Sequence, residues 1–123
     1  PYSPVPGDIL ACWGTGLIAR TIQFGTWGGP SHVALVVPNL GRELGIECGD
    51  APQVLESTSL STVPCCYRGT IVRGLQLHKW PTWLAAQQSV YAIQLRPVFA
   101  FRAHALDEFA FVSAGMLRDG AEY

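Results

Sequence analysis

A histidine, a glutamate and a serine in this sequence have settings that could support acyl-transfer chemistry: His32, Glu56 and Ser113. His32 opens the aliphatic run 32–37. An imidazole at the mouth of a buried strand is held rigidly, stays partly solvated and titrates near neutrality, so it is a candidate general base. The alternative for His32 is a histidine at the edge of the core that hydrogen-bonds to the backbone.

Glu56 and Ser113 supply the other two roles of a catalytic triad. Glu56 follows Val54-Leu55, and an ionisable group at the end of an apolar strand is costly unless it is paired. Its carboxylate could accept the imidazole N–H, fix the tautomer and stabilise the imidazolium; otherwise it is an edge-strand residue facing water. Ser113 begins a run of small residues, where a helix start could lend its dipole and N–H groups to a nucleophile. The alternative is a small packing residue.

Other polar and aromatic residues receive weaker assignments. Trp13, Trp27 and Ser31 flank His32 in the sequence and are candidates for substrate contact, although the tryptophans could equally be core residues. We expect Asp8 to order the turn before the first strand through backbone hydrogen bonds, and Cys12 to be a small core hydrophobe. The remaining histidines, at 78 and 104, are expected to be surface or packing residues.

The hydrophobic pattern predicts the elements that would position these residues. We expect an extended segment over 1–5, helices over 15–24, 81–88 and 103–118, and strands over 8–12, 32–37, 44–47, 53–58, 69–78 and 89–96. The β-branched run 32–37 predicts a strand buried on both faces. Several strands without long helices between them, followed by a terminal helix, predict a single α+β domain over 1–123 with a mostly antiparallel sheet.

Composition narrows the functional classes. Only 14% of the 123 residues are charged, and the net charge is −1. The lysine and arginine residues are scattered singly and form no basic stripe, so nucleic acid is not an expected partner. The thin surface charge leaves a membrane surface open as a partner. The four cysteines have no zinc-ligand spacing, and we expect no metal or cofactor. We interpret them as reduced thiols, which favours a cytosolic setting, and no apolar run reaches the roughly 20 residues of a membrane helix.

Several short motifs, taken in order, resemble a known family. They are Pro6-Gly7-Asp8-Ile9-Leu10, Ser31-His32-Val33-Ala34-Leu35-Val36-Val37, Val54-Leu55-Glu56-Ser57-Thr58 and Gly74-Leu75-Gln76-Leu77-His78. This series is similar to the circularly permuted papain-like enzymes, the YiiX-like and lecithin retinol acyltransferase-like branch of the NlpC-type amidases. The resemblance covers residues 6 to about 118. It implies a permuted papain-like fold with a histidine on one strand, an orienting residue on the next, and last a cysteine that opens a helix.

The resemblance places His32 as base, Glu56 as orienter and Ser113 at the position of the family's cysteine. It implies a thiol-type hydrolase that cleaves an amide through an acyl-enzyme, with a peptidoglycan peptide, a protein or a lipid as substrate. A lipid acyltransferase or acyl hydrolase is the alternative within this chemistry. An alcohol is a much weaker nucleophile than a thiolate near neutral pH. Three explanations for Ser113 therefore stay open: an inactivating Cys→Ser substitution, which we favour, a natural serine enzyme, and a catalytically dead binding module.

Overall fold

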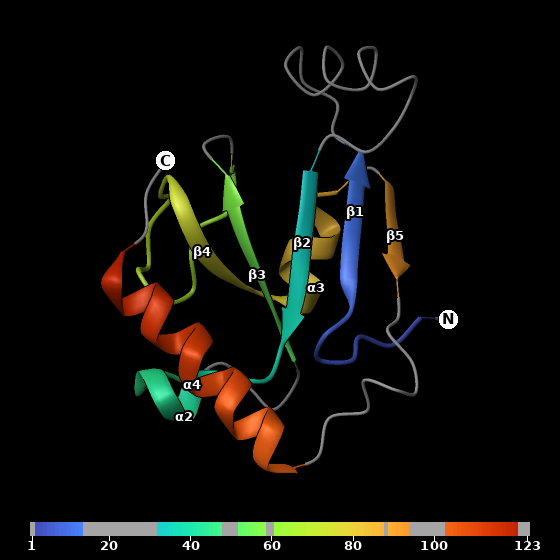
Figure 1. Cartoon of the computed structure of the whole chain (residues 1–123). Coiled ribbons are helices and arrows are strands. Elements are labelled where there is room, and N and C mark those ends of the chain that lie inside the picture. Colours follow the sequence, from blue (N-terminus) through green and yellow to red (C-terminus); the bar gives the residue numbers. More distant parts are fainter. Residues whose placement is uncertain are drawn as a thin grey trace.

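The fold is an α+β arrangement built on one antiparallel sheet (Figure 1). The computed structural model describes residues 2–13, 32–47, 52–58, 61–87, 89–93 and 103–120. Its strands are β1 (Ile9–Trp13), β2 (His32–Val37), β3 (Gln53–Thr58), β4 (Gly74–Lys79) and β5 (Ser89–Ile93), in the sheet order β4-β3-β2-β1-β5. Every neighbouring pair is antiparallel, which confirms the predicted α+β class with its antiparallel sheet.

Strand register divides the side chains of the sheet between two faces. Residues directly opposite each other in an antiparallel pair point to the same side, and successive residues alternate. Pairing of Cys12 with His32 and of Val36 with Val54 therefore places these four side chains on one face. Leu55, which pairs with Leu35 and with Leu77, lies on the other face.

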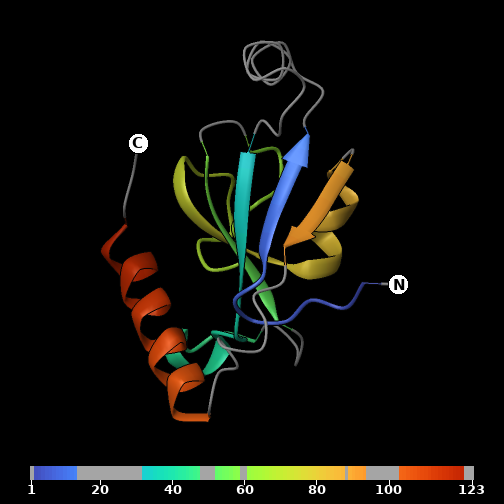
Figure 2. The ribbon, with the colours of Figure 1, turned by 45° about the vertical axis from the view of Figure 1, so that its right-hand side comes forward.

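A different helix covers each face. Helix α3 (Trp80–Ala85) packs through Trp83 on the face formed by Leu10, Cys12, Ala34, Val36 and Val54, which we call the α3 face. Helix α4 (Ala103–Asp119) packs through Ala110 and Leu117 on the face formed by Val37, Leu55 and Leu77, which we call the α4 face. Figure 2, turned from the first view, shows the sheet between the two helices. Both faces thus bury apolar side chains, and each has its own core.

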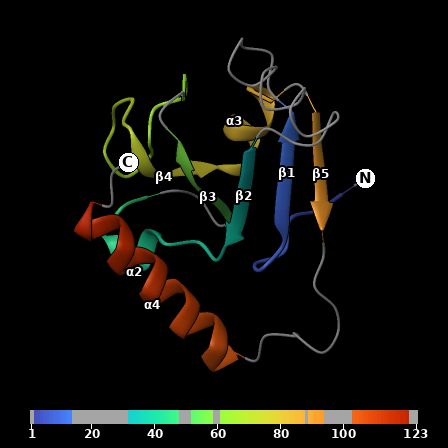
Figure 3. The same ribbon diagram turned by 45° about the horizontal axis from the view of Figure 1, so that its top comes forward.

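The helix boundaries follow from local sequence signals. Pro81 occupies the first turn of α3, where its missing N–H costs nothing. Gly120 follows α4 in the left-handed conformation with φ 69°, which a glycine adopts without strain and which ends the helix. The short helix α2 (Gly41–Leu44) ends in the same way at Gly45 and lies beside α4 (Figure 3).

The structure corrects some predicted elements. The predicted strand over 44–47 does not form, because α2 and the left-handed Gly45 take the chain out of extended conformation there. Strand β4 begins at Gly74 rather than at 69. Strand β2 is buried on both faces only toward its end, where Val36 and Val37 are buried on opposite faces, whereas Val33 near its start is 59% exposed. The predicted helix over 15–24 lies outside the described residues.

The segment before β1 is tied down through Asp8, as expected. The Asp8 carboxylate accepts hydrogen bonds from the Val5 N–H, at 3.1 Å, and from the Tyr2 hydroxyl. The pKa of Tyr2 is raised, first by burial and then by this contact.

In the described part of the chain, no helix combines the length and apolar character needed to cross a membrane.

Candidate general-base site

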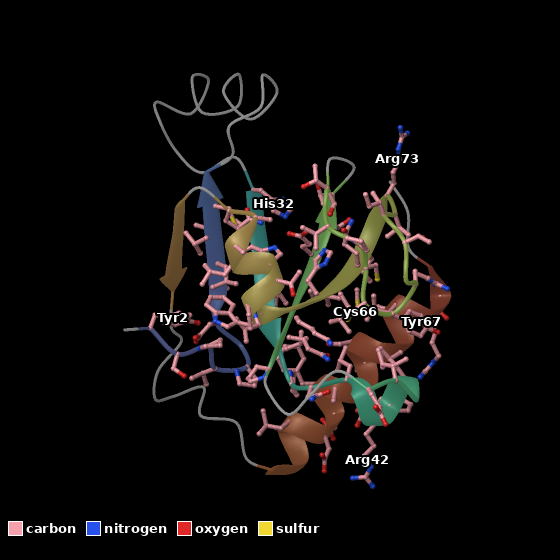
Figure 4. The ribbon with its side chains drawn as sticks, turned by 180° about the vertical axis from the view of Figure 1, so that it is seen from behind. Tyr2, His32, Arg42, Cys66, Tyr67 and Arg73 are labelled. Carbon is pink, nitrogen blue, oxygen red and sulfur yellow. The ribbon has the colours of Figure 1, made fainter. Side chains whose placement is uncertain are left out.

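The structure brings His32 and Glu56 together on the α3 face. His32 begins β2 and Glu56 lies in β3, and the His32 Nε2 is 3.0 Å from Oε2 of Glu56. In Figure 4, seen from behind, His32 lies near one end of β2 on the side of the sheet that carries α3. The His32 side chain is 27% exposed whereas that of Glu56 is 6% exposed. The pair therefore has one buried member and one member that solvent or a substrate can reach.

Glu56 is buried as a carboxylate, and three donors from the described residues lie around it. Oε2 accepts hydrogen bonds from Nε2 of His32 and, at 2.8 Å, from Nε1 of Trp83, and Oε1 lies 3.2 Å from Nε2 of His78. Burial on its own would raise the pKa of Glu56, but these hydrogen bonds outweigh it and lower the pKa to about 2. Glu56 is therefore ionised throughout the physiological range, and a buried carboxylate with satisfied oxygens holds its donors in fixed positions.

This geometry assigns the tautomer of His32. The ionised Glu56 carboxylate can only accept a hydrogen bond. Nε2 of His32 therefore carries a hydrogen and donates a hydrogen bond to the carboxylate. The other ring nitrogen, Nδ1, is then an acceptor when the ring is neutral. Among the described residues, Glu56 is the one side chain that hydrogen-bonds to His32. Nδ1 is thus the atom of His32 that is able to take a proton in general-base chemistry.

The structure does not bring Ser113 to this site, which corrects its assignment as the nucleophile. Ser113 is buried on α4 between Ala110 and Leu117, on the side of the helix that packs on the α4 face. His32 lies on the α3 face, so the sheet itself separates the two side chains. Ser113 also sits more than two turns inside the helix rather than at its start. Its structural role is that of a small residue in a helix–sheet contact.

Cys12 on β1 is the cross-strand partner of His32. Its side chain is buried in the α3-face core, as expected for a small hydrophobe. Burial, and secondarily the Glu56 carboxylate, raise the pKa of the Cys12 thiol to about 12. A thiol held in this protonated state is a poor nucleophile at neutral pH.

Trp83 and His78 belong to the site, and sequence reasoning missed both of these contacts. His78 was expected to be a surface or packing residue, but it is buried in β4 and contacts Glu56. The signal in the sequence was the alternation of β4, which places Gln76 and His78 on the face opposite to Leu75 and Leu77. No comparable signal assigns the indole N–H of Trp83 to a carboxylate 27 residues away.

The other predicted contacts are left untested. Trp27 and Ser31 lie outside the described residues, and for Trp13 and His104 the backbone is described but the side chain is not.

Cys12, Cys65 and Cys66 are thiols that take part in no disulfide. Within the described ranges, no three histidine, cysteine, aspartate or glutamate side chains are grouped so that they could hold a metal ion.

Comparison with known proteins adds no relative. No family model, no curated protein and no solved structure matches this chain.

Proposed function

We propose that this chain provides the general base of a hydrolase that cleaves an amide bond, with His32 as base and then acid and Glu56 as its orienting residue. The observation that carries the proposal is the 3.0 Å contact between a partly exposed imidazole and a buried, ionised carboxylate. A histidine and a carboxylate held in this way form the base half of a catalytic triad. The resemblance to permuted papain-like amidases supports the same roles for both residues.

The chemistry at His32 proceeds through Nδ1. In the first step Nδ1 takes the proton of a nucleophile, a thiol or a water molecule, as that nucleophile attacks the amide carbonyl carbon. Glu56 stabilises the resulting imidazolium through Nε2. In the second step Nδ1 returns the proton to the departing nitrogen and the C–N bond breaks. If the nucleophile is a thiol, the product is a thioester acyl-enzyme that water then hydrolyses by the same exchange of protons.

Neither Ser113 nor Cys12 meets the needs of the nucleophile. Ser113 lies on the other face of the sheet, and Cys12 is buried with a pKa of about 12. The proposal therefore assigns the base and its orienter and leaves the nucleophile unassigned.

The test is hydrolysis of short peptide amides by the protein and matched variants. His32→Ala is expected to reduce kcat/KM by ~10²-fold or more, since positioned proton transfer contributes about that much. Ser113→Ala is the control and is expected to keep the wild-type rate. If the wild-type protein cleaves no amide, or if His32→Ala cleaves as fast as the wild type, the proposal is wrong.

A lipid acyl group is the second candidate substrate. The observation that favours contact with a lipid surface is the apolar outer side of α4, where Phe111, Val112 and Met116 are 67%, 57% and 48% exposed. This side lies across the sheet from His32, so it supports membrane contact and not the binding of an acyl group at the base. An exposed apolar strip on a thinly charged protein is suited to a lipid surface. Release of fatty acid from phospholipid vesicles, lost in His32→Ala, would favour this substrate over a peptide. Vesicle binding that His32→Ala leaves intact, without hydrolysis of any substrate, would indicate a binding module.

A further inference from the structure

We infer that His78 is a buried imidazolium, protonated on both ring nitrogens, that positions Glu56 and balances its charge. The inference rests on the hydrogen-bond partners of the two ring nitrogens, each of which faces only acceptors. Its consequence for His32 rests in addition on the proposed function.

Nε2 of His78 must carry a proton because its neighbours accept hydrogen bonds. It lies 2.9 Å from Oε1 of Gln76 and 3.2 Å from Oε1 of Glu56. The orientation of the Gln76 amide is determined by its other end, where Nε2 lies 3.1–3.2 Å from three backbone carbonyl oxygens, those of Thr58, Val72 and Gly74. A flipped amide would place Oε1 against these three acceptors. Oε1 of Gln76 therefore faces His78 and can only accept.

Nδ1 of His78 must carry a proton for the same reason. It lies 3.2 Å from the backbone carbonyl oxygen of Pro64, which is an acceptor and nothing else. Without a proton, Nδ1 would turn a lone pair toward that oxygen in a site where the side chain is 1% exposed and water is excluded. A buried polar atom left without its hydrogen bond is costly. Both nitrogens are therefore donors, and an imidazole with two N–H groups carries a positive charge.

Among the residues that the structure describes, the counter-charge of His78 is the Glu56 carboxylate. A buried charge is tolerated when it is paired and hydrogen-bonded, and here both partners have every polar atom engaged. In the described part of the chain, the other titratable groups that face the pair are His32 from β2 and Cys12 from β1. The neighbouring Lys79 is exposed at the end of β4. His78 and Glu56 thus form a neutral unit beneath His32.

This neutral unit affects the candidate base. A lone buried carboxylate next to His32 would draw a second proton onto the ring and occupy Nδ1. With the charge of Glu56 balanced by His78, the carboxylate still orients the ring through Nε2 but attracts the second proton less strongly. His78 is therefore a positioning residue that keeps Nδ1 of His32 available as a base.

The protonation state is tested by ¹⁵N NMR of the histidine rings in the wild-type protein at pH 7.5, where an exposed imidazole is mainly neutral. His78 is expected to show two protonated nitrogens, and His32 one protonated and one unprotonated nitrogen. His32→Ala and His78→Gln assign the signals by their disappearance. A neutral His78, with one nitrogen unprotonated at this pH, would overturn the inference whether or not the protein hydrolyses an amide.

The effect on His32 is tested by His78→Gln, which keeps an N–H donor near Glu56 and removes the positive charge. We expect the ratio of protonated to neutral His32 at a given pH to rise about tenfold, and the acid limb of kcat/KM to move to higher pH by about one unit. Lys79→Gln, which removes an exposed cation from the next residue, is the matched control and should move neither quantity. An unmoved His32 signal in a folded His78→Gln protein would refute the positioning role. Absence of hydrolysis with an unchanged NMR result would refute the proposed function alone.

Discussion

The three-donor environment of Glu56 makes a quantitative prediction for Glu56→Gln. The pKa of this carboxyl falls from its ordinary 4.5 to about 2 in the folded protein. At about 1.4 kcal/mol per pKa unit, that difference stabilises the fold by about 3 kcal/mol above pH 5. Breaking a buried ion pair by removing one partner costs about 3–5 kcal/mol in other proteins, which is the same range.

The geometry explains why glutamine cannot replace the carboxylate. Both oxygens of Glu56 face donors: Oε2 accepts hydrogen bonds from His32 and Trp83, and Oε1 lies 3.2 Å from Nε2 of His78. A glutamine offers one oxygen and one NH₂ group, so in either orientation the NH₂ group faces a donor. The variant thus loses the negative charge and also leaves a buried donor without an acceptor.

The sign of the pH dependence follows from the direction of the shift. The pKa of Glu56 is lower in the folded protein than in the unfolded chain. The stabilisation that the Glu56 carboxylate gives the fold is therefore complete above about pH 5 and is lost as the pH falls toward 2. The free energy of unfolding of the wild-type protein should therefore exceed that of Glu56→Gln by about 3 kcal/mol at pH 7. This difference should fall below about 1 kcal/mol near pH 2.

Urea unfolding at several pH values measures this gap. With a slope of about 2 kcal/mol per molar urea, the midpoint of Glu56→Gln should lie about 1.5 M below that of the wild type at pH 7. Glu108→Gln removes an exposed carboxylate from α4 and is the control, with an expected change within about 0.5 kcal/mol. A gap that is small at pH 7, or that stays constant down to pH 2.5, would refute the reasoning.

Three further predictions concern stability and thiol reactivity. Trp83→Phe removes one donor to Glu56 and should lower the free energy of unfolding by about 1.5–3 kcal/mol in urea titrations. Gly41→Ala should lower the free energy of unfolding by about 1–3 kcal/mol, because the new Cβ would lie 2.6 Å from a backbone oxygen. Gly115→Ala, which has open space on α4, should raise the free energy of unfolding by about 0.5–1 kcal/mol. In folded protein near pH 8, Cys12 and the thiol introduced by Ser113→Cys should react with iodoacetamide more slowly than in urea; fast labelling of either would contradict its assigned burial.

Most of the sheet could be predicted from the sequence, because its strands are short apolar or alternating runs bounded by turn residues. Strands β2 and β3 form at the predicted residues, and α4 extends the predicted helix by one residue. The strand over 44–47 was wrong because a stretch of four residues carries too little periodicity to exclude a helical turn. Exposure of Val33 could not be predicted either, since it depends on how much of the α4 face the helix covers.

The site was predictable only where it depends on strand alternation. His32 and Glu56 were paired correctly because each lies in a recognisable strand. Ser113 was misplaced for a physical reason: periodicity shows which side of a helix is apolar but not which face of a sheet that side will cover. The contact of His78 with Glu56 depends on the order of β4 and β3 in the sheet, which is a long-range property.

The polar network beneath His32 also depends on the packing of α3, so stability and site geometry are coupled. Trp83 fills the α3-face core and donates its indole N–H to Glu56 with the same side chain. It stacks on Trp80 at 6.0 Å between ring centroids, and the ring of Tyr2 meets Trp80 edge-on at 5.6 Å. Aromatic contacts thus connect the N-terminal segment to the residue that holds the carboxylate. Loosening α3 would remove a donor from Glu56 and expose the carboxylate, and the orientation of His32 would be lost before the sheet itself unfolds.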